Sequence, residues 1–467
     1  MSKWEPVIGL EIHVQLKTRT KMFCRCENVS GDDENVHTCP VCLAHPGALP
    51  VLNGKAIDWT IRLGAALGCT IAERAIFHRK NYFYQDLPKG YQISQYNQPL
   101  CEGGAVTVPR ATEDLEVGIT RAHLEEDAAK TIHVGGEAGR IQGASTSLVD
   151  FNRGGTPLVE IVTEPDLRSA EDSKAFLQLL RQTIVELGIS DAEMEKGSLR
   201  CDANVSVRPT GQTELAAKTE LKNMNSFSFV AKGVNAEIAR QIAAYEAGKS
   251  VTQQTMHFDP QSGTLLALRT KEEAHDYRYF PEPDLVAIEP DADVVARASA
   301  GVGELPGQRI RRLEEELGFE LAESLVTTGR DGLYERVEGD RRSVANVIMN
   351  QLAGAGIELA DVGADELARL IEARERIPRH RFDEAIGEVG KPGFSAAPYL
   401  AEEAVADADA LAPLIDAVLA EHAGQVEAYR GGKDGLLGFF VGQVMKATDG
   451  KANPRAVNEL LREKLQG

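Results

Sequence analysis

The feature that most constrains the fold is a short apolar segment with one carboxylate at its centre. Residues 157–162 read Pro-Leu-Val-Glu-Ile-Val, and they follow an Asp-Phe-Asn-Arg loop and a Gly-Gly turn. An apolar, β-branched run of this length predicts a buried strand. Burying the carboxylate of Glu160 is costly unless it is paired or binds a metal ion. The sequence therefore predicts a cation beside Glu160.

Length and composition indicate an ordinary soluble globular protein. The 467 residues are 43% hydrophobic and 26% charged, and this length is typical of about three domains. No apolar run is long enough to span a membrane, and the N-terminus shows no signal-peptide core, so we expect a cytoplasmic protein. The net charge of −20 argues against indiscriminate nucleic-acid binding, although it leaves room for one local basic face.

The N-terminal segment offers two candidate ligands for such a cation. Glu11 and His13 alternate with apolar residues in the period-2 pattern of a strand. They therefore project from the same face, about 7 Å apart along the strand, so both can reach one ion. A solvated polar face is the alternative interpretation, because antiparallel sheets commonly have one wet face.

A second segment, residues 117–130, has the alternation of a strand and carries two neighbouring carboxylates, Glu125 and Glu126. The face that carries Glu126 is the more apolar one, so we expect it to point inward. Glu125 would then be solvated. Glu126 is therefore predicted to lie beside Glu160 as a second buried carboxylate.

Four of the seven cysteines form two close pairs, separated by a turn-rich loop. Cys24, Cys26, Cys39 and Cys42 have the spacing that a closed tetrahedral zinc site needs. Four reduced cysteines without a metal are the alternative. Disulfides are not expected from an odd number of cysteines in a cytoplasmic chain.

Two further segments carry the residues of a binding pocket. Residues 77–92 interleave basic residues, including Lys80 and Lys89, with aromatic ones such as Tyr82. Cations can contact phosphate and aromatic rings can stack on a base, although a surface hairpin with tyrosine-rich strands fits the pattern equally well. Residues 199–208 predict a strand with one wholly polar face, which is typical of the floor of a site.

The composition changes near Pro290 and again near Ala410. Residues beyond Pro290 are almost wholly helical in pattern. From Tyr429 onward, seven Lys and Arg residues stand against four Asp and Glu residues. This local basic excess favours contact with RNA, and a small helical bundle with a solvated rim is the alternative.

Familiar nucleotide and hydrolase motifs are absent from the sequence. It contains no Walker A loop, no G-x-G-x-x-G opening a βα unit and no G-x-S-x-G elbow. A nucleotide would therefore have to be bound by carboxylates, a metal ion and basic side chains.

Several longer motifs resemble one known family, the GatB family, whose members are the B subunits of tRNA-dependent amidotransferases. The resemblance covers essentially the whole chain and rests on VIGLEIHVQL, RKNYFYQDLPKGYQISQ, HLEEDA, LVDFNRGGTPLVEIVTEPD, GSLRCDANVSVRP, ELKNMNSF and DYRYFPEPDL. It implies an α+β fold: an antiparallel-sheet cradle, then an all-α helical domain and a small helical tail domain. The implied boundaries are 1–290 for the cradle, with a zinc knuckle at 24–42, then 291–405 and 406–467.

The resemblance also implies an activity and its partners. Members of this family use ATP to phosphorylate the side-chain carboxylate of Glu-tRNA(Gln) or Asp-tRNA(Asn), and ammonia then displaces the phosphate. The ammonia comes from an amidase subunit, and a small third subunit completes a heterotrimer, so the complex is a ligase. The implied cofactors are ATP and Mg²⁺, with Mn²⁺ as the alternative ion because imidazole is an unusual Mg²⁺ ligand; zinc would brace the knuckle. The tail domain would contact tRNA.

The family's functional residues map onto positions of this sequence. Its metal ligands fall on Glu11, His13, Glu126 and Glu160, and Glu126, Lys80 and Lys89 would be catalytic. The nucleotide would contact Lys80, Tyr82, Lys89, Asn152, Arg153, Asp202, Asn204 and Lys222. Ammonia should arrive near Glu126. Two alternatives remain: a non-catalytic zinc-containing tRNA-binding scaffold and a stand-alone metallohydrolase.

Overall fold

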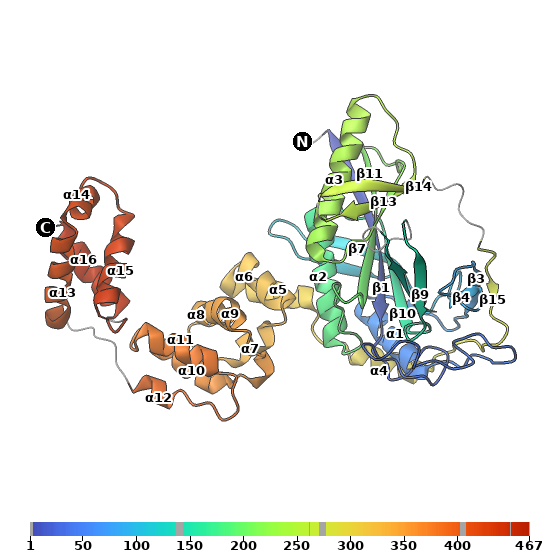
Figure 1. Ribbon diagram of the computed structural model, residues 1–467, viewed down its shortest axis with the longest axis horizontal. Coiled ribbons are helices and arrows are strands. Elements are labelled where there is room, and N and C mark those ends of the chain that lie inside the picture. Colours follow the sequence, from blue (N-terminus) through green and yellow to red (C-terminus); the bar gives the residue numbers. More distant parts are fainter. Residues whose placement is uncertain are drawn as a thin grey trace. The chain divides into compact units, whose positions relative to one another are not determined.

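The computed structural model describes residues 3–136, 143–260, 262–269, 277–401, 408–448 and 450–466. The chain divides into two compact units, residues 1–309 and 310–467 (Figure 1). Strands occur only in the first unit among the described residues, whereas the second is helical.

A large sheet forms the centre of the first unit. Its middle strand is β1 (Trp4–Gln15), which pairs antiparallel with β10 (Pro157–Thr163) on one side and β11 (Leu199–Pro209) on the other. Beyond β10 lies β7 (Leu115–Glu126). The remaining strands of this sheet are β2 (Thr70–Ile71), β5 (Cys101–Glu102), β6 (Ala105–Val108), β12 (Thr219–Lys222), β13 (Gln254–Asp259) and β14 (Thr264–Arg269). All pairings in it are antiparallel except that between β12 and β13.

One face of this sheet is apolar and is covered by helices. In β11 the alternate residues Cys201, Ala203 and Val205 are buried, as the period-2 pattern predicts. Helix α3 (Phe227–Glu246) packs against β11 and against α2 (Ala170–Glu186). Ser169 caps α2 by accepting a hydrogen bond from the amide of Asp172. The polar side chains of β11 consequently lie on the opposite face.

Two smaller sheets and two helices complete the first unit. The strands β15 (Phe280–Pro281), β3 (His78–Asn81) and β4 (Tyr91–Ser94) form one sheet, and β8 (Lys130–Val134) pairs with β9 (Thr146–Asp150). Helix α1 (Gly54–Ala66) packs against α4 (Ala292–Ala300). Strand β4 also packs against β7 and so joins the small sheet to the large one.

The second unit consists of helices. The division falls within α5 (Pro306–Leu317), and the helices that follow are α6 (Phe319–Thr327), α7 (Asp331–Arg336), α8 (Arg341–Asn346), a π-helical segment (Val347–Leu352), α9 (Ala353–Ala355), a 3₁₀ turn (Leu359–Asp361), α10 (Ala364–Ala373), α11 (Arg379–Glu388), α12 (Ala397–Leu400), α13 (Ala408–Glu421), α14 (Ala423–Arg430), α15 (Leu436–Ala447) and α16 (Pro454–Gln466). The last four helices share a small core that includes Leu411, Phe440 and Leu461. No helix within the described ranges is both long and apolar enough to cross a membrane.

The predicted fold class is confirmed. A sheet domain is followed by a helical region and a small helical tail. Among the described residues, no strand follows β15, and the first helix after it is α4 at Ala292, close to the change in composition at Pro290. The boundaries 1–290, 291–405 and 406–467 stay a prediction, since the two compact units divide the chain at a different point.

Candidate active site

The register of three central strands gathers five titratable side chains on the polar face of the sheet. His13 of β1 lies opposite Glu160 of β10, and Glu160 lies opposite His123 of β7. Residues that are opposite one another in a sheet, or two apart along a strand, share a face. Glu11 and Glu125 therefore join the same group, which we call the acidic cluster.

The atoms of the acidic cluster lie close enough together to hold a cation. His13 Nε2 is 3.5 Å from Glu160 Oε2, 3.6 Å from Glu125 Oε1 and 4.0 Å from Glu11 Oε1. Two overlapping triplets, Glu11–His13–Glu160 and His123–Glu125–Glu160, each keep their ligand atoms within 4.8 Å of one another. Oxygen-rich donors of this kind suit Mg²⁺, and the imidazole suits Mn²⁺ as well.

Burial and mutual charge perturb the acidic cluster. Burial, helped by the charge of Glu160, raises the pKa of Glu125 to about 7. Burial acts to raise the pKa of Glu160 too, but His123, His13 and Arg121 hold it below its usual range. Burial lowers the pKa of His123 to about 4. Burial acts in the same direction on His13, but its contacts with Glu160 and Glu125 raise its pKa. Perturbations of this kind concentrate at functional sites.

The sequence assigned the wrong environment to Glu125. We expected Glu126 to point toward Glu160 and Glu125 to be solvated, but Glu125 is only 2% exposed and belongs to the acidic cluster. Glu126 is 3% exposed and projects from the other face of β7, where it pairs with Lys89 and accepts a hydrogen bond from Ile93 N. The reason is that β4 covers the end of β7, so that neither carboxylate is solvated.

The sequence did not identify Arg121 and His123 as residues of the site, although the alternation along β7 pointed to them. Arg121, His123 and Glu125 alternate along β7 and share one face. A face with two charged groups and an imidazole resembles that of Glu11 and His13 on β1. Matching these two faces would have identified Glu125 in place of Glu126.

Of the two predicted phosphate-binding lysines, Lys80 lies beside the acidic cluster. Burial acts to lower the pKa of Lys80, but the charges of Glu125 and other nearby groups outweigh it and raise that pKa above its ordinary value. Lys80 Nζ lies 5.0 Å from the ring centroid of Tyr277 and 6.0 Å from that of Tyr82. Lys89 instead pairs with Glu126.

Three predicted pocket residues lie on the other flank of β1. Asp202 is opposite Glu11 in the register of β1 and β11, and Asn204 is two residues further along the same face. Lys222 of β12 forms an ion pair with Asp202. A cavity of about 150 Å³ opens here, lined in part by Glu11, Asn204 and Glu220. These residues therefore adjoin the acidic cluster.

The structure does not bring Asn152 and Arg153 together with the acidic cluster. Asn152 Oδ1 accepts a hydrogen bond of 2.8 Å from His37 N, and Asn152 Nδ2 donates one of 2.8 Å to the carbonyl of Asp33. Arg153 donates to the carbonyls of residues 128–129 at 2.9 and 2.7 Å. Both side chains therefore brace loops through hydrogen bonds to the backbone, and Arg153 Nε also lies 3.7 Å from Asp127 Oδ2.

The four predicted zinc ligands lie together. The Sγ atoms of Cys24, Cys26, Cys39 and Cys42 are all within 4.8 Å of one another, and those of Cys39 and Cys42 are 3.9 Å apart. A tetrahedral zinc site with Zn–S bonds of about 2.3 Å needs S···S separations of about 3.8 Å. The hydrogen bond from Cys24 and contacts with the Cys39 amide and Lys21 lower the pKa of Cys42 to about 5. The donor set and spacing fit zinc.

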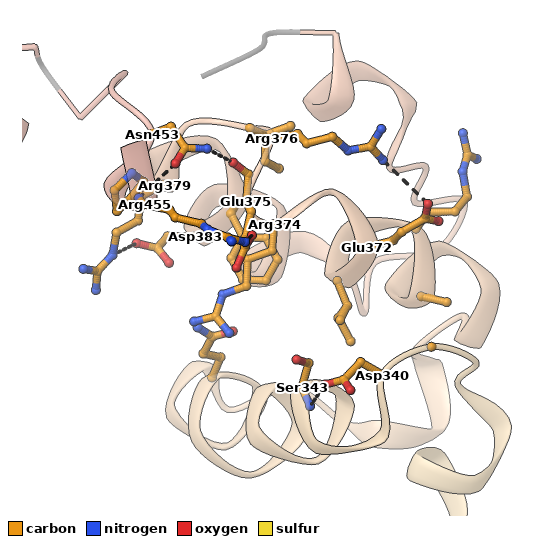
Figure 2. Close-up of a pocket in the computed structure, with 18 of the residues that line it drawn as sticks. Asp340, Ser343, Glu372, Arg374, Glu375, Arg376, Arg379, Asp383, Asn453 and Arg455 are labelled. Atoms are coloured by element: carbon orange, nitrogen blue, oxygen red, sulfur yellow. Dashed lines mark hydrogen bonds and ion pairs between the residues drawn. The ribbon is translucent and has the colours of Figure 1, made fainter. Parts of the chain in front are cut away.

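The second unit contains a cavity of about 1180 Å³, shown in Figure 2, but its lining does not suggest a reaction. Several of its charged side chains pair with one another: Arg376 lies 3.7 Å from Glu372, and Arg379 lies 3.6 Å from Asp383. No metal-binding group was found there among the described residues. The candidate chemistry therefore belongs to the sheet of the first unit.

The fold and the site together define an α+β protein with a cluster of carboxylates and imidazoles on the polar face of its sheet, spaced closely enough to hold a cation. Residues 6–296 match the family model described as the GatB/GatE catalytic domain, and residues 335–465 match the one described as the GatB domain. The chain belongs to the GatB family.

Similar curated proteins agree with this assignment along the whole chain. A protein of Syntrophotalea carbinolica, named as the B subunit of the aspartyl/glutamyl-tRNA(Asn/Gln) amidotransferase, is 46% identical over 484 residues, covering 100% of this chain and 99% of its own. The proteins of the same name from Nitratidesulfovibrio vulgaris and Geobacter sulfurreducens are 44% and 45% identical and are covered along 100% of their length. They cover 100% and 99% of this chain.

Proposed function

We propose that this chain is the part of a tRNA-dependent amidotransferase that activates and amidates the misacylated amino acid. ATP would phosphorylate the side-chain carboxylate of Glu-tRNA(Gln), Asp-tRNA(Asn) or both, and ammonia would then displace phosphate. The single observation that carries the proposal is the acidic cluster, placed on the sheet of a chain that belongs to this family.

The proposed chemistry needs what the acidic cluster can offer. Ammonia attacks a free carboxylate poorly, whereas an acyl phosphate supplies a leaving group. Phosphoryl transfer depends chiefly on in-line positioning and on neutralising the charge of the phosphate oxygens. A divalent cation supplies much of that neutralisation when bound. Glu11, His13, Glu125 and Glu160 would hold it.

The other residues of the site would bind and orient the substrates. Lys80 keeps its charge beside Glu125 and Glu160, which suits contact with phosphate. Asp202, Asn204 and Lys222 would line the nucleotide pocket on the opposite flank, with Tyr82 beside Lys80.

Ammonia should arrive from the side of Glu126. A cavity of about 220 Å³ there is lined in part by Lys89, Glu126, Lys21 and Cys42. It lies on the face of β7 that is turned away from the acidic cluster, and it adjoins the cysteines at which we place zinc.

The partners follow from the same proposal. An amidase subunit would release ammonia from glutamine, a small third subunit would complete a heterotrimer, and the complex would act as a ligase in the cytoplasm. The relatives are named as one subunit of an amidotransferase, which supports an assembly with other subunits. The basic residues of the tail would contact tRNA.

The decisive test is Glu160→Ala in the complex reconstituted with its amidase and small subunits. Release of glutamate from glutamine should persist, while ATP-dependent amide formation on misacylated tRNA should collapse. Unchanged amide formation would exclude the proposal.

One alternative draws on the cysteine cluster. A non-catalytic zinc-containing scaffold would bind tRNA and turn over no ATP with any combination of partners. It gives no reason to gather three carboxylates and two imidazoles of which Glu125, Glu160 and His123 are buried, since buried charges are costly. A stand-alone metallohydrolase would instead act without ATP or partners, so the same assays separate all three.

A further inference from the structure

Two residues of β7, Arg121 and His123, lie beside the carboxylate of Glu160. Arg121 NH2 is 3.7 Å from Glu160 Oε1, and His123 Nε2 is 3.6 Å from Glu160 Oε2. The same His123 nitrogen is 3.9 Å from Glu125 Oε2. Each oxygen of Glu160 therefore has one of these two residues as a neighbour.

The contact between Arg121 and His123 determines which ring nitrogen carries the proton. Arg121 Nε donates to His123 Nδ1 at 3.3 Å. An arginine stays protonated and has no acceptor, so Nδ1 of His123 must offer its lone pair. His123 is then neutral, with its proton on Nε2, the nitrogen that lies 3.6 Å from Glu160 Oε2 and 3.9 Å from Glu125 Oε2.

This tautomer is the opposite of the one that a metal ligand needs. A ligating imidazole presents a lone pair to the metal and donates the N–H of its other nitrogen to a neighbouring acceptor. His123 has its N–H on the side of the carboxylates and its lone pair on the side of Arg121. The short distance between His123 and Glu160 would by itself suggest that His123 is a metal ligand. The hydrogen bond that His123 Nδ1 accepts from Arg121 excludes that role.

We propose that His123 and Arg121 are positioning residues, which hold the carboxylate of Glu160 for the cation, and that His13 is the one imidazole ligand. The inference rests on the proposed function only in that the site must bind a cation. Strand register supports it, because Glu160 lies between His13 on one side and His123 on the other.

The burial of His123 favours its contact with Glu160 over contact with water. His123 is 2% exposed, so water cannot readily satisfy its N–H. A carboxylate that binds a metal through one lone pair can accept a hydrogen bond through another, and such support orients the ligand. Glu160 can therefore serve the cation and His123 at the same time.

The test counts imidazole ligands in the full-length chain loaded with Mn²⁺. Electron spin-echo envelope modulation should detect one coordinated imidazole in the unmodified protein. His13→Leu should abolish the nitrogen signal, whereas His123→Leu should keep it. Two coordinated imidazoles in the unmodified protein, or loss of the signal in His123→Leu, would overturn the inference without the need for any enzymatic assay.

Affinity gives the second readout. Mn²⁺ titration should show that His123→Leu weakens binding by about 10- to 100-fold, the usual cost of losing support around a metal ligand. His123→Gln should restore binding to within a few-fold, because its amide can donate from the position of Nε2. Equal affinity of the Leu variant and the unmodified protein would contradict the positioning role.

Arg121→Met provides a second variant in case His123→Leu does not fold, since the Arg121 side chain is 36% exposed. It should also lower the Mn²⁺ affinity, and an unchanged affinity would count against the inference.

The proposed function and the positioning role of His123 and Arg121 can each be overturned without the other. Loss of amide formation in Glu160→Ala together with two coordinated imidazoles would support the proposed function and overturn this one.

Discussion

At the scale of single residues, Glu125 and Glu126 show how far two neighbouring carboxylates can differ. Glu125 lies 3.6 Å from His13 and accepts a hydrogen bond from Ser94 Oγ at 3.1 Å. Glu126 projects from the other face of β7 and pairs with Lys89. Both are buried, so burial does not distinguish their roles, whereas the face of the strand does.

Neutralising these two residues one at a time should separate their roles. We expect Glu125→Gln to weaken Mn²⁺ binding by at least about tenfold, since it would remove a charged group from the proposed cation site. Glu126→Gln is the matched control, with the same change one residue away, and should leave the affinity within about twofold. Isothermal titration of the full-length chain measures both, and equal losses would contradict the assignment.

Cation binding should also depend on pH. The pKa of Glu125 is raised to about 7, so below pH 7 the carboxyl is largely protonated and must lose a proton to bind a metal ion. Mn²⁺ affinity should therefore fall as the pH drops from 8 to 6, by at most about tenfold per unit for each proton released. Glu125→Gln should weaken this dependence and leave the part due to His13, whose pKa is also raised and which must be neutral to bind a metal ion. An affinity that rises toward pH 6 would contradict the prediction.

The sequence could predict part of the site because burial and strand phase are local properties. The apolar residues around Glu160 indicated a buried carboxylate, and alternation put Glu11 and His13 on one face. The environment of Glu125 was not predictable in this way, because β4, some 30 residues earlier, covers the end of β7. The hydrophobic periodicity of a strand does not indicate which distant segment will pack against it.

At the scale of structural elements, the cysteine knuckle is joined to the loop that leads into β10. Asn35 N donates to Asp150 Oδ1 at 3.1 Å, and Phe151 N donates to Asn35 Oδ1 at 2.8 Å. His37 N donates to Asn152 Oδ1. This explains Asn152, which the sequence assigned to the nucleotide pocket, because its partners lie about 115 residues away in the knuckle.

Replacing one of the proposed zinc ligands should therefore loosen both segments together. In Cys39→Ser we expect loss of zinc and at least about tenfold faster hydrogen exchange at the amides of His37 and Phe151, since metal binding free energy contributes to folding. Cys69→Ser is the control, because Cys69 lies outside the cluster. Exchange that is unchanged in Cys39→Ser, with zinc lost, would show that the knuckle does not brace this loop.

At the scale of the whole molecule, the charge is unevenly distributed along the chain. The protein carries a net charge of −20, yet the tail from Tyr429 onward has a basic excess. Lys433 and Lys446 are exposed there. Phosphate contacts depend on such local groups more than on net charge, so an acidic protein can still bind tRNA through one basic region.

Replacing these two lysines should reduce tRNA binding and leave the sheet site intact. In the reconstituted complex we expect Lys433→Ala with Lys446→Ala to weaken tRNA binding and to lower the slope of log K against log salt by about one for each lysine that contacts a phosphate. Lys174→Ala, an exposed lysine on α2, is the control and should leave the slope unchanged. The Mn²⁺ affinity of the double variant should match that of the unmodified protein, because the acidic cluster lies in the other compact unit. An unaltered salt slope in the double variant would show that tRNA contacts other residues, and a changed Mn²⁺ affinity would show that the two units do not act independently.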